Sequence, residues 1–150
     1  MMEKGFTLVE IIIVVGILLT LATITITALS KFSQFTALSK DTEKIVSLLN
    51  RARSDTISSK NDVRYGVHFE STKAVLFAGD SYVSNTMTNE VVTVLPTATI
   101  RSVTLNGGGS NVLFDRLTGA TSESGNIIIS LLGSGANSRQ ITISSNGVAQ

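Results

Sequence analysis

The chain has 150 residues, a net charge of +1 and no cysteine. Its length is that of a single domain, and its near-neutral charge gives no basis for attraction to nucleic acid or to acidic surfaces. Without cysteine it can form no disulfide, no thiol nucleophile and no cysteine-ligated metal site.

The first predicted element is a helix of membrane length near the N-terminus. Residues 11–29 carry no charged side chain, and one acid, Glu10, stands at the head of this run. Roughly nineteen helical residues span about 28 Å, which is close to the hydrocarbon thickness of a bilayer. A carboxylate within such a segment is costly and calls for a cationic partner. We therefore expect a transmembrane helix in which Glu10 has a functional role.

The residues around Glu10 form a specific motif. Gly5-Phe6-Thr7-Leu8-Val9-Glu10, followed by the apolar run, resembles the leader and N-terminus of type IV pilins and type II secretion pseudopilins. The resemblance implies that residues 1–5 are a leader, that a prepilin peptidase cuts between Gly5 and Phe6, and that Phe6 is then N-methylated. It also implies that Glu10 meets the N-terminal amine of a neighbouring subunit during assembly.

Elementary electrostatics explains why an N-terminal amine at Phe6 and the carboxylate of Glu10 would pair. Cleavage after Gly5 creates an α-amine, which is cationic near neutral pH. A lone ammonium and a lone carboxylate are each penalised in lipid, and pairing relieves both penalties. Such a pair favours subunits that dock in one register. A Sec signal peptide would instead be cut after the apolar run, around residues 27–30.

A single long helix is predicted over residues 6–59. Residues 6–30 would form its transmembrane or filament-core part, and residues 31–150 a globular domain whose amphipathic helix runs to about residue 59. An apolar stripe with a spacing of three and four supports that helix, and charged residues, Asp41 among them, fall on the expected water face. The stripe consists of Phe35, Leu38, Thr42, Ile45, Leu49, Ala52 and Thr56.

The remainder, residues 61–150, is predicted to be rich in strands. Val63, Tyr65, Val67 and Phe69 alternate with Arg64, Gly66, His68 and Glu70, which is the period of a half-buried strand. Further strands are predicted at 74–77, 90–95, 99–105, 112–114, 126–132, 139–144 and 148–149, and residues 79–89 as a polar loop. A helix followed only by strands predicts an α+β fold in which the helix packs on an antiparallel sheet. That is also the pilin architecture.

Three shorter segments carry a second resemblance. Residues 48–57, 114–119 and 141–147 are similar to the GspH/FimT-type minor pseudopilins. This resemblance implies a minor subunit of a filament.

The sequence offers little for catalysis or for a cofactor. His68 is the only histidine, and its place on the outward alternation predicts an exposed side chain. No Gly-x-Ser-x-Gly elbow occurs. Asp115 and Glu123 supply oxygen atoms, but their spacing does not match a calcium loop. We therefore expect no enzyme, no cofactor and no metal site.

The leading hypothesis is a structural filament subunit. Its expected place is the inner membrane, with the C-terminal domain outside the cytoplasm, and then a filament in the periplasm or at the cell surface. The partners implied are the prepilin peptidase, other pilin or pseudopilin subunits, the inner-membrane assembly platform and membrane lipid. A membrane-anchored extracytoplasmic binding module remains an alternative. So does a competence pilin that captures DNA, although Arg101, Arg116 and Arg139 are few and scattered. The residues leave open whether the system is a pilus, a secretion machine or a competence filament.

Overall fold

The computed structural model describes residues 5–132 and 134–150. Of the expected leader, only Gly5 therefore lies within the described residues. The chain divides into two compact units between Phe35 and Thr36, and each is described here by itself.

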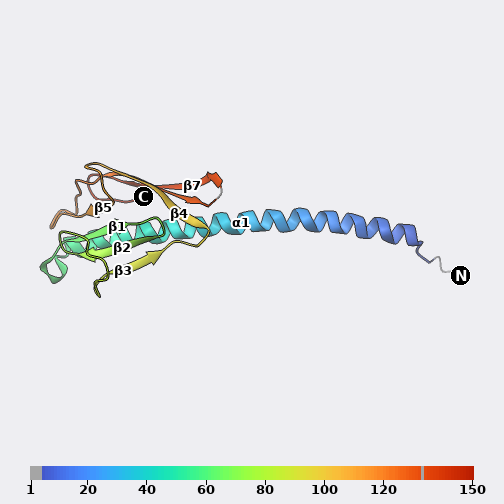
Figure 1. Ribbon diagram of the computed structural model, residues 1–150, viewed down its shortest axis with the longest axis horizontal. Helices are drawn as coiled ribbons and strands as arrows, with labels where there is room; N and C mark the ends of the chain where they lie inside the picture. The colour runs from blue at the N-terminus through green and yellow to red at the C-terminus, as the bar shows by residue number, and fades with distance from the viewer. Residues whose placement is uncertain (1–4, 133) are drawn as a thin grey trace. The chain divides into compact units, whose positions relative to one another are not determined.

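One long helix, α1 (Leu8–Ile57), begins in the first unit and ends in the second (Figure 1). It starts two residues later than expected because Thr7 caps it: the Thr7 hydroxyl accepts the backbone N–H of Glu10 at 3.2 Å. At the other end, Ser59 takes a left-handed conformation with φ of 50° and stops the helix. A short 3-10 helix, η1 (Lys60–Asp62), follows.

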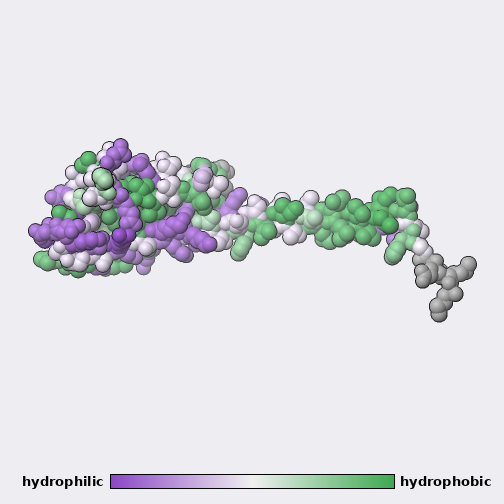
Figure 2. Space-filling view, turned by 90° about the horizontal axis from the view of Figure 1, so that it is seen from below, coloured by the Kyte–Doolittle hydropathy of each residue, from purple (hydrophilic) through white to green (hydrophobic). Residues whose placement is uncertain are grey.

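The first unit is an uncovered apolar helix. Its large apolar side chains from Phe6 to Phe32 are exposed, and they give this part of the chain the hydrophobic surface seen in Figure 2. The hydroxyls of Thr20, Thr23, Thr25 and Thr27 each donate to a carbonyl within the helix. Because these hydroxyls and the helical backbone are satisfied within the segment, this part of the helix suits an apolar environment. It is long and apolar enough to cross a membrane.

The second unit holds two antiparallel sheets. One has the order β3-β2-β1-β5 and the other the order β4-β6-β7. The strands are β1 (Tyr65–Phe69), β2 (Lys73–Ala78), β3 (Glu90–Thr93), β4 (Ala98–Leu105), β5 (Asn111–Leu113), β6 (Gly125–Leu131) and β7 (Ser134–Ile143). The α+β class is confirmed, with the strands divided between two sheets instead of one. β7 begins five residues before the predicted start, and the expected last strand is a single bridge between Ile143 and Ala149.

Both sheets share a core with α1. Leu38, Ile45, Leu49, Ala52 and Thr56 are fully buried, which confirms most of the predicted stripe. Tyr65, Val67 and Phe69 of β1 are buried with them, as the alternation predicted, and Ile127, Ile129 and Ile141 join from the second sheet. Phe35 lies in the first unit and is exposed.

Asp41 corrects the prediction for the water face. It is only 2% exposed, and its Oδ2 accepts the N–H of Leu95 at 2.7 Å. Its other oxygen accepts from the Lys44 ammonium at 3.1 Å. Leu95 lies where the chain leaves β3 for the other sheet at Pro96, so its N–H has no strand partner. Asp41 is buried because this N–H needs an acceptor.

Candidate functional site

The processing motif lies at the start of the first unit. Phe6, Glu10, Ile11, Val14 and Val15 line an apolar hollow of about 280 Å³. Phe6 is 80% exposed, and among the described residues Glu10 forms no ion pair. Phe6 and Glu10 are thus brought to one surface, and the Glu10 carboxylate has no cationic partner within the described part of the chain.

Glu10 also belongs to the capped first turn of α1. Thr7 and Glu10 have the spacing of a capping box, a sequence signal that the predicted helix start at residue 6 does not include. Glu10 lies in the first helical turn, where the free N–H groups and the helix dipole favour a carboxylate. The cap therefore holds the Glu10 side chain one turn from Phe6.

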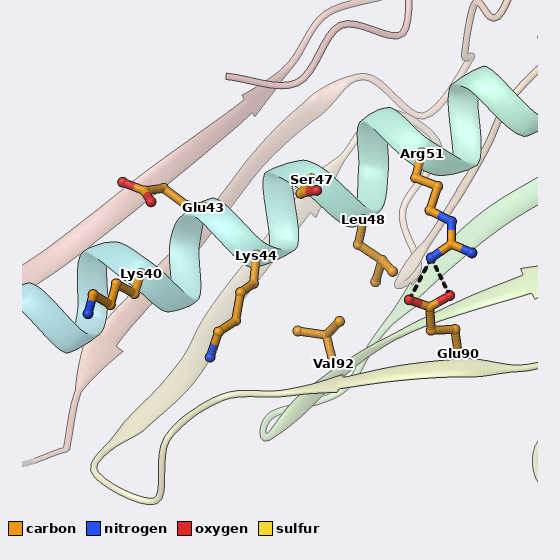
Figure 3. A pocket seen from close by; sticks show the side chains of 8 residues that line it. All are labelled: Lys40, Glu43, Lys44, Ser47, Leu48, Arg51, Glu90 and Val92. Carbon is orange, nitrogen blue, oxygen red and sulfur yellow. Dashed lines mark hydrogen bonds and ion pairs between the residues drawn. The ribbon is translucent and has the colours of Figure 1, made fainter.

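In the second unit, a groove of about 510 Å³ runs between α1 and β3 (Figure 3). Leu48 and Val92 face each other across its floor. Arg51 closes one end by pairing with Glu90 at 2.7 Å. The remaining lining residues are Lys40, Glu43, Lys44 and Ser47. Charges of both signs line the groove, so it does not concentrate one sign of charge.

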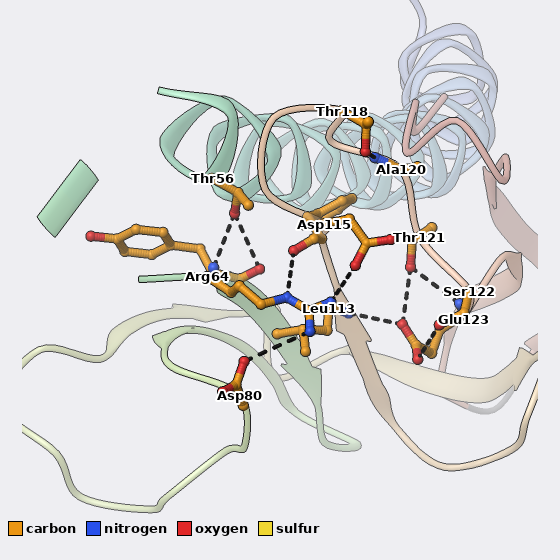
Figure 4. A network of polar contacts seen from close by, with 12 residues as sticks. Thr56, Arg64, Asp80, Leu113, Asp115, Thr118, Ala120, Thr121, Ser122 and Glu123 are labelled. Atoms are coloured by element: carbon orange, nitrogen blue, oxygen red, sulfur yellow. Dashed lines mark hydrogen bonds and ion pairs between the residues drawn. The ribbon is translucent and has the colours of Figure 1, made fainter. Parts of the chain in front are cut away.

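A polar network joins the end of α1, β1 and the loop after β5 (Figure 4). The Arg64 guanidinium donates to the carbonyl of Phe114 at 3.1 Å and to the carboxylate of Asp115 at 2.5 Å. It also lies 3.7 Å from Asp80. Nearby, Thr56 accepts the N–H of Tyr65 at 3.0 Å and donates to Ala52 at 2.8 Å. These contacts fix the strand and the loop to the helix.

Glu123 belongs to this network, and the pKa of its carboxyl is shifted. Burial raises the pKa of its carboxyl, but hydrogen bonds from Ser122, Leu113 and Thr121 and from its own backbone outweigh burial and lower it overall. The N–H of Leu113 donates to Oε2 at 3.2 Å, and the Ser122 hydroxyl donates to Oε1 at 2.8 Å. Glu123 thus acts as an ionised acceptor that ties its loop to β5.

The single histidine corrects another expectation. The His68 side chain is 21% exposed, and its ring stacks on Tyr82 at 4.0 Å between centroids. Its Nδ1 lies 2.6 Å from Oδ1 of Asn111. Tyr82 also meets Phe77 edge-on, so part of the loop at 79–89 covers the outer face of the first sheet. His68 is therefore a packed side chain that holds this loop.

The described residues do not gather into a metal centre. Over residues 5–132 and 134–150, no group of three histidine or acidic side chains has the geometry to hold an ion. Asp115 binds Arg64, whereas Glu123 binds hydroxyl and N–H donors. The arginines weighed for DNA are separated too: Arg139 contacts Ser39 early in the second unit, and Arg116 pairs with Asp62 beyond the end of α1.

The first unit thus supplies an apolar helix of membrane-spanning length, and the second a β-rich globular domain. Residues 41–147 match the family model described as the type II transport protein GspH. The match covers more than half of the chain, so the chain belongs to the GspH family, and the resemblance to type II secretion pseudopilins is confirmed. No curated protein and no solved structure matches the chain.

Proposed function

We propose that this chain is a minor structural subunit of a type II secretion pseudopilus. The family match over residues 41–147 carries the proposal, and the uncovered apolar helix supports it. In this proposal residues 1–5 are the leader, residues 6–30 the transmembrane and filament-core helix, and residues 31–150 the globular domain.

Processing would prepare the chain for assembly. A prepilin peptidase cuts between Gly5 and Phe6, and Phe6 is N-methylated, which keeps the charge on its amine. Two features support this step: Phe6 is exposed and lines the same apolar hollow as Glu10, and Glu10 has no cationic partner among the described residues.

Pairing between subunits would then set the register. The Glu10 carboxylate of one subunit binds the Phe6 amine of another, where lipid or packed helices exclude water. Each charge alone is penalised there, so a displaced neighbour would leave two uncompensated charges. One axial offset between subunits is thereby favoured over the others.

The proposed location follows from this role. The subunit is first held in the inner membrane with its C-terminal domain outside the cytoplasm, and lipid surrounds its helix. It then joins other pseudopilins through the inner-membrane assembly platform. A solitary binding module is the weaker candidate, because the groove beside β3 has apolar and mixed-charge walls without a convergent polar site.

The intact mass of the mature protein tests processing. Chain purified from cells that contain a prepilin peptidase should have the mass of residues 6–150 plus one methyl group. The same chain from peptidase-deficient cells should retain residues 1–5, and a Gly5→Leu variant should do so in both. A mature N-terminus beyond Leu29 would contradict the proposal.

A further inference from the structure

Leu117 has an unusual backbone and an uncovered side chain. It is 81% exposed, and its φ is +69°. A single exposed leucine is ordinary on a protein surface. A bulky residue held in the left-handed region is not, because its Cβ crowds the following carbonyl, and such strain persists only where the surroundings enforce it.

The surroundings of Leu117 do enforce it. The N–H of Gly119 donates to the carbonyl of Asp115 at 2.8 Å, and the N–H of Asp115 donates to the carbonyl of Ala120 at 2.8 Å. On the side chains, Arg64 holds Asp115, while Arg116 binds both the carboxylate and the carbonyl of Asp62. The loop is thus fixed on both sides of Leu117.

The loop lies at one end of the globular unit, beside the last turn of α1. A Cβ added to Gly119 would come within 2.6 Å of Cδ1 of Ile57, so the two residues are in close contact. Nε of Arg53 donates to the carbonyls of Gly119 and Asn146, at 3.2 Å each. This is the C-terminal end of α1, whereas the chain enters the unit at Thr36.

Most charged side chains on this surface form ion pairs with one another. Arg116 pairs with Asp62, Arg64 with Asp115 and Lys60 with Asp55. Arg53 at this end is hydrogen-bonded to two backbone carbonyls, and the other three cations each pair with an acid, so the surface does not concentrate positive charge for a polyanion or an anionic lipid headgroup. Beside these groups, Leu117 and Ile57 expose apolar surface.

We propose that Leu117 is an anchor that inserts into an apolar pocket on the globular domain of a neighbouring filament subunit. The inference rests on the proposed function. A stable interface between free proteins buries about 1,200 Å² or more, which one leucine and its rim do not reach. Such a contact suits neighbours that their N-terminal helices already hold at high effective concentration. The rigid loop keeps the ordering cost of docking low.

Leu117→Asn separates this role from a structural one. Asparagine tolerates the left-handed conformation, so the melting temperature of the full chain should stay unchanged or rise. Incorporation into sheared filaments should nevertheless fall severalfold. Val83→Asn is the matched control, since Val83 is an exposed apolar residue in another loop, and it should assemble like the wild type. A clearly lower melting temperature for Leu117→Asn would assign Leu117 a structural role and overturn the proposal.

Crosslinking identifies what covers Leu117. The chain has no cysteine, so Leu117→Cys provides a unique site for a photo-crosslinker in assembly-competent cells. We expect adducts with a filament subunit, and their loss when Glu10→Ala blocks assembly. If the wild type enters filaments and Leu117→Asn enters equally, or if the probe reaches only lipid or water, the anchor is wrong and the proposed function stands. If the wild type is absent from filaments, both are wrong.

Discussion

Thr56 joins the end of α1 to the first strand through a single hydroxyl. It is fully buried, and its hydroxyl accepts the N–H of Tyr65 at 3.0 Å. Thr56→Val keeps the shape but leaves that N–H unpaired, which should cost about 1–3 kcal/mol of stability. Urea unfolding measures the loss. Thr42→Val is the control, because the Thr42 hydroxyl only donates to its own helix, and an equal loss there would contradict this reading.

Glu123 should make stability depend on acid pH. Hydrogen bonds lower its pKa in the folded chain below the usual 4.5, so its contribution is present above that value. It should be lost as the pH falls through the folded pKa. Glu123→Gln should therefore melt lower than the wild type at pH 7, and the two melting temperatures should converge as the pH falls through the lowered pKa of the folded chain. A constant difference across that range would show that the carboxylate charge is not responsible.

Residue-scale features were also the least predictable from the sequence. Asp41 looked solvated because a charge beside an apolar stripe normally faces water. Its partner, the N–H of Leu95, becomes unsatisfied only when the chain crosses between sheets, which no local pattern encodes. His68 looked exposed for a similar reason: the alternation of β1 assigns its face, but the loop that supplies Tyr82 covers that face.

At the scale of elements, hydrophobic periodicity carried most of the prediction. The stripe at 38–56 located the helix face, and the alternation at 65–69 located the first strand. Periodicity did not predict the division into two sheets. The chain changes sheet three times: at Pro96, through Gly107, Gly108 and Gly109, which all have positive φ, and between β5 and β6. Turn residues predict where a strand ends, but they do not predict which sheet the next strand joins.

The packing of α1 on both sheets is testable in the second unit. A fragment of residues 36–150 should fold alone, because its apolar residues meet in a core of their own. Ile45→Asp should unfold it, since an unpaired buried charge costs several kcal/mol, comparable to the stability of a domain. Lys40→Ala, at an exposed position, should change stability by no more than about 0.5 kcal/mol. Circular dichroism during urea titration distinguishes them, and a stable Ile45→Asp fragment would refute this packing.

At the scale of the whole molecule, the surfaces of the two units differ in polarity, and the two units therefore need different surroundings. Residues from Phe6 to Phe32 expose apolar side chains, whereas the globular unit buries most of its own in a core and exposes charges of both signs. The apolar unit is stable only in lipid or against other apolar helices. A subunit that moves from a membrane to a filament core satisfies that need in both places.

Substitution of Glu10 tests most directly whether its carboxylate pairs with the Phe6 amine of a neighbouring subunit. The decisive measurement is the amount of Glu10→Ala relative to wild type in sheared filament fractions, from membranes that contain equal amounts of both. We predict normal membrane insertion, because an intramembrane charge is removed, and a strong loss from filaments. Glu10→Gln, which keeps the size without the charge, should be lost as well. Equal incorporation of wild type and Glu10→Ala would contradict the pairing of Glu10 with the Phe6 amine of a neighbour.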